Sequence, residues 1–121
     1  MNQTDNKYNL EERTACFAEE VVRFCKTLTE TSISKPIILQ LIRSATSIGA
    51  NYMEANGASS KKDFANKIFI CKKESQETKY WLRILKVSYP KLADEIAILE
   101  KEVQELILIF NKIAFTLRNG K

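Results

Sequence analysis

An apolar repeat runs from Leu92 to Leu117 and predicts a long α-helix over about residues 91 to 118. The apolar residues are three or four positions apart, so they line one side of a helix with 3.6 residues per turn. Further apolar residues occur off this line in the second half, and a helix that is apolar nearly all round needs cover on more than one side. The repeat consists of Leu92, Ile96, Leu99, Val103, Leu106, Phe110, Ile113 and Leu117.

Three more segments have the same helical period, over about residues 10–30, 35–55 and 61–88. Asn9 and Ser60 are the N-caps expected for the first and the third of them, because a short polar side chain can accept a hydrogen bond from the first turn. The chain has only three glycines and two prolines, which leaves little material for the many turns of an all-β fold. One proline suits the first turn of the second helix, and the other ends the third.

The length of 121 residues fits one domain, over residues 1–121. Four helices joined by short connections predict an all-α fold, namely an antiparallel up-down-up-down four-helix bundle.

Two polar lines lie beside apolar ones on the second and third helices. Charged groups between apolar neighbours lose hydration and need donors, so the two lines are expected to face each other, within one chain or between two. The open alternative is that all of them are solvated. The first line is Arg43, Ser47, Asn51 and Glu54, and the second holds Glu74 and Glu77 between Ile70, Trp81 and Ile84.

The third helix therefore carries a second stripe that a single bundle does not need, and the fourth carries surplus apolar surface. Together they predict a cyclic homo-oligomer, because closure avoids open-ended growth. Tyr80 and Trp81 fit an interface at helical spacing, with stacking on nucleic-acid bases as the alternative.

The net charge of +4 is concentrated between residues 61 and 91, where nine basic residues stand against three acids. This stripe is a candidate surface for RNA or DNA, and a solvated face is the alternative interpretation. Its members are Lys61, Lys62, Lys72, Lys73, Lys79, Arg83 and Lys86.

No cofactor, metal or catalytic site is expected. The chain has no histidine, no CxxC and no nucleotide-binding glycine loop, and a pair of glutamates such as Glu74 and Glu77 lacks the ligands of a di-metal site. Three widely spaced cysteines suit reduced thiols, and no signal peptide or membrane-spanning run is apparent, so a cytoplasmic protein is expected.

Three stretches resemble the four-helix-bundle proteins encoded in intervening sequences of bacterial 23S ribosomal RNA genes, a family that includes the accessory variability protein of diversity-generating retroelements. They are RSATSIGANYMEA at 43–55, SSKKDF at 59–64 and ESQETKYWL at 74–82. The resemblance implies a bundle that assembles into a five-fold barrel, with a role near nucleic acid or a nucleic-acid-handling partner. The motif positions are Arg43, Ser47, Asn51, Glu54, Glu74, Glu77, Tyr80 and Trp81.

Two functions follow as hypotheses. The first is a non-catalytic oligomeric scaffold or adaptor whose partner is itself, a pentamer by the resemblance, and it does not involve a membrane. The alternative is an RNA- or DNA-binding module that uses the basic stripe of the third helix.

Overall fold

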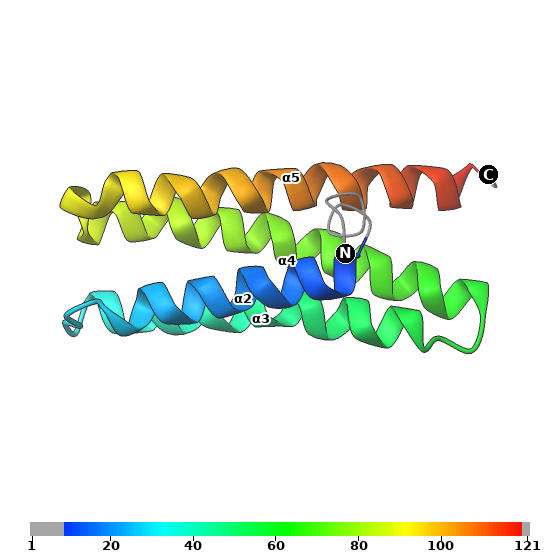
Figure 1. Ribbon diagram of the computed structural model, residues 1–121, viewed down its shortest axis with the longest axis horizontal. Coiled ribbons are helices and arrows are strands. Elements are labelled where there is room, and N and C mark those ends of the chain that lie inside the picture. Colours follow the sequence, from blue (N-terminus) through cyan, green and yellow to red (C-terminus); the bar gives the residue numbers. More distant parts are fainter. Residues whose placement is uncertain (1–8, 120–121) are drawn as a thin grey trace.

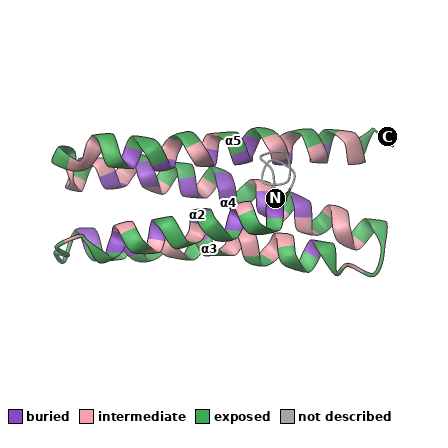
Figure 2. Ribbon diagram, viewed as in Figure 1, coloured by how far each residue is buried: buried purple, intermediate pink, exposed green. Residues whose placement is uncertain are grey.

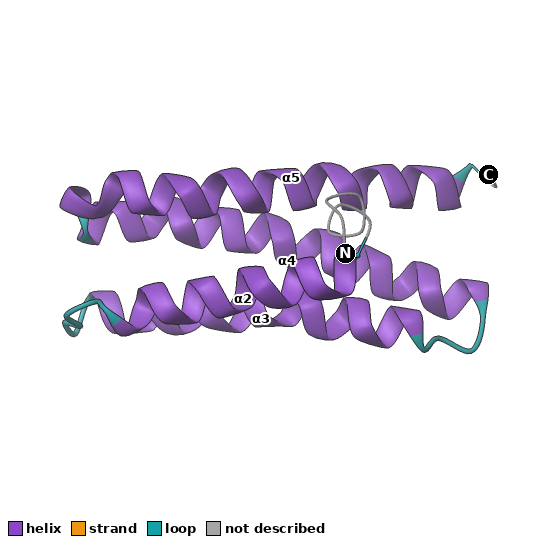
Figure 3. Ribbon diagram, viewed as in Figure 1, coloured by secondary structure: helices purple, strands orange, loops and turns teal. Residues whose placement is uncertain are grey.

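The computed structural model describes residues 9–119, which contain four α-helices and no strand (Figure 3). Within these residues the all-α prediction is confirmed, and no helix combines the length and apolar character that a membrane crossing needs. The elements in chain order are α2 (Leu10–Lys26), α3 (Ser34–Asn56), α4 (Lys61–Ser88), the short 3-10 helix η1 (Pro90–Leu92) and α5 (Ala93–Arg118).

The predicted caps are present at two helix starts. The side chain of Asn9 accepts a hydrogen bond from the backbone N–H of Glu12 at 3.1 Å, and that of Ser60 accepts one from the N–H of Asp63 at 3.0 Å. Each bond satisfies a backbone donor that the helix itself cannot pair. Helix α4 has the predicted bounds, and α3 extends one residue beyond its predicted bounds at each end.

Two helix ends differ from the prediction. The helix expected over residues 10–30 ends at Lys26, because Thr27 turns the chain and its hydroxyl donates to the carbonyl of Phe24 at 2.7 Å. The helix expected from residue 91 begins instead at Ala93. The residues before it form η1, in which the N–H of Leu92 donates to the carbonyl of Tyr89.

Helices that are consecutive in the chain lie side by side (Figure 1). The α2–α3 and α4–α5 connections are at one end of the molecule and the α3–α4 connection is at the other. The first two connections are tied together, since the hydroxyl of Tyr89 donates to the carbonyl of Thr29 at 2.8 Å and hydrogen-bonds the hydroxyl of Ser34 at 2.8 Å. The α3/α4 contact is the most extensive, α2 and α5 touch over a smaller area, and α2 and α4 do not pack together.

The apolar core lies along the inner sides of all four helices (Figure 2). Small polar residues bring α3 and α4 close, with the hydroxyl of Thr78 donating to that of Ser44 at 2.9 Å in the buried interior. Gly49 permits a similar approach of α2, because a Cβ at this position would lie only 3.1 Å from the hydroxyl oxygen of Thr14. Fully buried side chains include Phe17, Val21, Leu41, Ile48, Ile68, Leu82, Leu85, Leu106 and Phe110.

Candidate functional site

A polar cluster lies where α3 and α4 meet on the surface. One guanidinium nitrogen of Arg43 on α3 is 3.6 Å from a carboxylate oxygen of Glu74 on α4, and another donates a hydrogen bond to Glu77. The indole N–H of Trp81 donates to the same carboxylate oxygen of Glu77 at 3.2 Å. Residues of the two polar lines predicted from the sequence therefore meet within one chain.

Glu74 is the buried member of this cluster. Its side chain is only 9% exposed, whereas that of Arg43 is 50% exposed. Its oxygen Oε1 is buried without a hydrogen bond, so the nearby guanidinium neutralises charge without donating to it. A buried carboxylate oxygen that lacks a donor is costly, so Glu74 depends on the charge of Arg43.

The remaining predicted residues extend the cluster along the same two helices. Asn51 donates its side-chain amide to the hydroxyl and the carbonyl of Ser47, and Glu54 forms an ion pair with Lys67 of α4 at 2.6 Å. Tyr80 is 55% exposed and stacks edge-on against the ring of Trp81. We call the surface formed by Arg43, Ser47, Asn51, Glu54, Lys67, Glu74, Glu77 and Trp81 the α3/α4 face.

The predicted basic stripe divides into two groups. Lys79 and Lys86 reach across to α5, where their ammonium groups donate to Gln104 at 2.5 Å and to Glu100 at 3.0 Å. Lys72 is half-buried and forms no ion pair with a described residue. The other four, which are exposed and likewise form no ion pair within residues 9–119, are Lys61, Lys62, Lys73 and Arg83.

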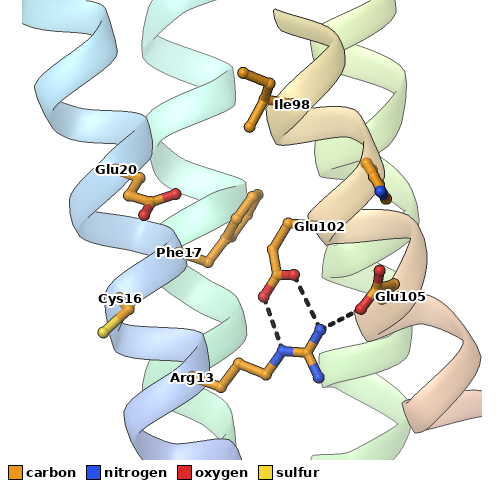
Figure 4. A pocket seen from close by; sticks show the side chains of 8 residues that line it. Arg13, Cys16, Phe17, Glu20, Ile98, Glu102 and Glu105 are labelled. Carbon is orange, nitrogen blue, oxygen red and sulfur yellow. Dashed lines mark hydrogen bonds and ion pairs between the residues drawn. The ribbon is translucent and has the colours of Figure 1, made fainter. Parts of the chain in front are cut away.

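A second polar group, which the sequence reasoning missed, connects α2 to α5 (Figure 4). Arg13 donates to both oxygens of Glu102 at 2.8 and 2.9 Å and to Glu105 at 2.6 Å. These bonds, those to Glu102 most of all, raise the pKa of Arg13 above its ordinary value. The available signal was that Arg13 lies between Leu10 and Phe17 on the apolar side of its helix.

Two hollows lie along this α2/α5 seam. One of about 390 Å³ surrounds the Arg13 group and is also lined by Glu20, Ile98 and Lys101 (Figure 4). The other, of about 600 Å³, is mainly apolar and also has Lys112 in its wall. Its apolar lining residues are Leu10, Tyr52, Leu108, Ile109 and Ile113.

The three cysteines are free thiols, and Cys16 is among the residues that line the hollow around the Arg13 group. Burial raises the pKa of Cys25 to about 11 and that of Cys71 to about 12. Cys16 is exposed, and its hydrogen bond to Glu12 raises its pKa. Within residues 9–119 no group of three or more His, Cys, Asp or Glu side chains is placed to hold a metal ion.

Comparisons with known proteins identify the family of the chain. The model of the 23S rRNA-intervening sequence protein family matches residues 6–112. The chain belongs to this family. The resemblance found in the helix motifs is thus confirmed over nearly the whole sequence.

A solved structure is similar to this member of the 23S rRNA-intervening sequence family. It is a crystal structure of a protein of unknown function from the S23 ribosomal protein family of Bacteroides thetaiotaomicron. The sequences are 32% identical, and the match covers 86% of this chain and 96% of the other with a TM-score of 0.78. No protein with a curated description matches the chain.

Proposed function

We propose that the protein is a non-catalytic oligomeric scaffold or adaptor, in which copies of an antiparallel up-down-up-down bundle associate into a closed ring. The observation that carries the proposal is the α3/α4 face, where a buried carboxylate is neutralised by a cation that is itself half exposed. Glu74 keeps a buried carboxylate oxygen without a donor, while its neighbour Arg43 is half exposed. Five copies is the number that the family resemblance implies.

The energetics favour cover from another molecule. A buried acceptor without a donor costs about 1–3 kcal/mol, and more when it is charged. Exposed apolar side chains on the same two helices add surface that water hydrates poorly, since Leu39 on α3 is 56% exposed and Val87 on α4 is 79% exposed. A second protein surface over the face would remove the apolar groups from water and would shield the half-exposed guanidinium of Arg43, which strengthens its attraction to Glu74.

The same groups argue against catalysis at the glutamate pair. Glu77 is held by Arg43 and Trp81, and Glu74 faces the same guanidinium. Groups fixed in this way support a structural contact rather than proton transfer to a substrate. A cytoplasmic site of action fits the three reduced thiols.

Sedimentation velocity of the full chain tests the scaffold proposal. We expect one species whose mass is a whole multiple of the 13.9 kDa chain. Tyr80→Glu, which places a charge beside Trp81, should shift that species toward the monomer, whereas Arg23→Glu at an exposed position on α2 should leave it unchanged. A strict monomer at micromolar concentration would refute the proposal.

A second candidate function is binding of single-stranded RNA or DNA, favoured by one line on the outer side of α4. Every residue of this line is exposed, none is acidic, and cations alternate with aromatic rings. Cations attract the phosphate backbone, and aromatic rings can stack on bases. The line consists of Lys62, Asn66, Phe69, Lys73, Gln76, Tyr80, Arg83 and Val87.

A mobility-shift titration with single-stranded RNA and DNA tests this candidate. Binding is expected at low salt and should weaken steeply as salt rises, because phosphate contacts release counterions. Lys73→Ala with Arg83→Ala should weaken binding at every sequence tested, whereas Lys26→Ala with Arg23→Ala on α2 should have little effect. No retention at low salt would end this candidate.

A further inference from the structure

The apolar hollow of about 600 Å³ belongs neither to the α3/α4 face nor to the basic line on α4. Leu10 of α2, Tyr52 of α3 and Ile113 of α5 are among the residues that line it. Its volume lies within the range of about 300–1,000 Å³ that is typical of sites for small molecules, which are mainly apolar with a few polar groups. The hollow is therefore large enough for a ligand.

The apolar lining is held in place by the core beneath it. Leu10 is buried, and Ile109 and Ile113 are partly buried against the core. The ring of Tyr52 packs against that of Phe110, with their centroids 6.0 Å apart. Because these contacts already exist in the protein alone, a ligand would not have to order the lining when it binds.

The charged groups of the lining differ between the two ends of the hollow. They are Arg13, Glu105 and Lys112. Arg13 is engaged with Glu102 and Glu105, whereas Lys112 is exposed and outside every ion pair of residues 9–119. Glu105 and Lys112 are seven residues apart on α5, which is about 10 Å along the helix axis. An acidic group at Lys112 is thus attracted by an unpaired ammonium and lies far from the carboxylate.

The smaller hollow of about 390 Å³ does not suit an acidic ligand. Three carboxylates line it, those of Glu20, Glu102 and Glu105, against the two cations Arg13 and Lys101. The larger hollow has two cations against one carboxylate. Charge therefore distinguishes the two hollows, and an acid should prefer the apolar one.

We infer that the apolar hollow binds a small free monocarboxylic acid with an unbranched alkyl chain. The carboxylate pairs with the ammonium of Lys112, and the chain lies over Leu10, Ile109 and Ile113. The lining extends along α5 from Glu105 to Ile113, about 12 Å, which matches an extended chain of about ten carbons. This inference does not depend on the proposed ring.

Isothermal titration calorimetry of the full chain tests the chain and the head group separately. The affinity should rise about fourfold for each methylene group from hexanoate through octanoate to decanoate, all kept below their micelle concentrations. Octanol has the same chain as octanoate but no charge, and it should bind more weakly.

A matched pair of variants locates the head group. Lys112→Gln should weaken the binding of octanoate about two- to fivefold and leave that of octanol unchanged. Lys101→Gln, which removes the cation beside the smaller hollow, should affect neither ligand. Both lysines are exposed, so both variants should fold, and circular dichroism checks that they do.

Methyl NMR locates the chain. Octanoate should shift the methyl signals of Ile109 and Ile113, whereas that of Ile98 in the smaller hollow should stay in place. Nuclear Overhauser contacts of Ile113 in the protein without ligand reveal any other occupant. Contacts with residues 1–8 or with a second copy would show that the chain itself fills the hollow, and the inference would be wrong.

Three further results would also overturn the inference. They are no binding of any of the acids, equal affinity for octanol and octanoate, and equal weakening by Lys101→Gln and Lys112→Gln. The last two would mean that the acidic group is not recognised at Lys112. None of these results bears on the proposed scaffold, because sedimentation measures the assembly of the chain without a ligand.

Discussion

Arg43 and Glu74 lie 3.6 Å apart between α3 and α4, and the Glu74 oxygen at that distance accepts no hydrogen bond. Charge rather than a hydrogen bond therefore holds the pair. This relationship makes the guanidinium the main neutralising group for a carboxylate that is buried in the single chain.

Removing the guanidinium should be costly for this reason. Arg43→Ala should lower the free energy of unfolding by about 1–3 kcal/mol, because it leaves the Glu74 carboxylate buried without its cation. The loss should shrink in a Glu74→Gln background, where no charge remains to be neutralised. Urea unfolding of the four proteins of this double-mutant cycle measures the coupling, and equal losses in both backgrounds would show that the two side chains do not interact.

The Arg13 group should hold α2 against α5. Arg13→Ala should lower the free energy of unfolding by about 1–3 kcal/mol, since it leaves Glu102 half-buried without its partner. Hydrogen exchange should accelerate in α2 more than in α3, because α3 is also held by its extensive contact with α4, whereas α2 does not pack against α4. Arg23 on the same helix makes no such contact, so the free energy of unfolding of Arg23→Ala should stay within about 0.5 kcal/mol of the wild-type value. The same result for both arginines would contradict the role of this group.

Gly49 offers a prediction in which the sign of the effect reverses. Alanine is preferred to glycine in a helix by about 1 kcal/mol, but the new Cβ would meet the Thr14 hydroxyl at 3.1 Å. That hydroxyl is held by its hydrogen bond to the carbonyl of Leu10 at 2.7 Å, so Gly49→Ala should destabilise the protein. In a Thr14→Ala background the obstruction is gone, and the same change should stabilise the protein. Thermal unfolding of the variants checks this, and the same sign in both backgrounds would rule out the steric explanation.

The two buried thiols predict a loss of stability in alkali. The folded-state pKa values, about 11 for Cys25 and about 12 for Cys71, lie above the ordinary value of 9.0. The folded protein therefore binds these protons more tightly than the unfolded chain does. Their contribution to the free energy of unfolding is complete below pH 9 and is lost between pH 9 and pH 12. At pH 10 the loss should be about 1 kcal/mol for each thiol.

Unfolding in urea at pH 8 and pH 10 measures this loss. Cys71→Ala should reduce the difference between the two pH values, whatever its effect at pH 8. Met53→Ala, which removes an exposed side chain without a titratable proton, is the matched control. An unchanged difference in Cys71→Ala would mean that other groups cause the alkaline sensitivity.

The helix bounds could be predicted wherever the sequence contains a strong local signal. Helix α4 starts after the Ser60 cap and ends before Pro90, as expected. The end of α2 at Lys26 could not be predicted, because no glycine or proline marks it. The hydroxyl of Thr27 bonds back to the last turn of this helix, and the connection that follows is held by bonds of Thr29 and Ser34 to Tyr89, about sixty residues further along the chain.

The candidate site shows the same division. The meeting of Arg43 with Glu74 and Glu77 could be predicted, because polar residues interrupt two apolar stripes on helices that follow each other in the chain. The pairing of Arg13 with Glu102 could not be predicted, because it joins the first and the last helix. The apolar period of a helix shows which of its sides is buried, but it does not show which other helix that side contacts. Likewise, Lys79 and Lys86 pair with α5, and nothing in α4 alone distinguishes them from Arg83.

The bonds of Tyr89 to Thr29 and Ser34 join the two helical hairpins at the end opposite the α3–α4 connection. The two hairpins are thus connected by the polypeptide at one end and by the Tyr89 hydroxyl at the other, in addition to the packing of α3 against α4 between these ends. Neither hairpin can swing away from the other without breaking one of these fastenings. Opening the bundle between its two hairpins therefore requires the Tyr89 bonds to break together with the packing of α3 against α4.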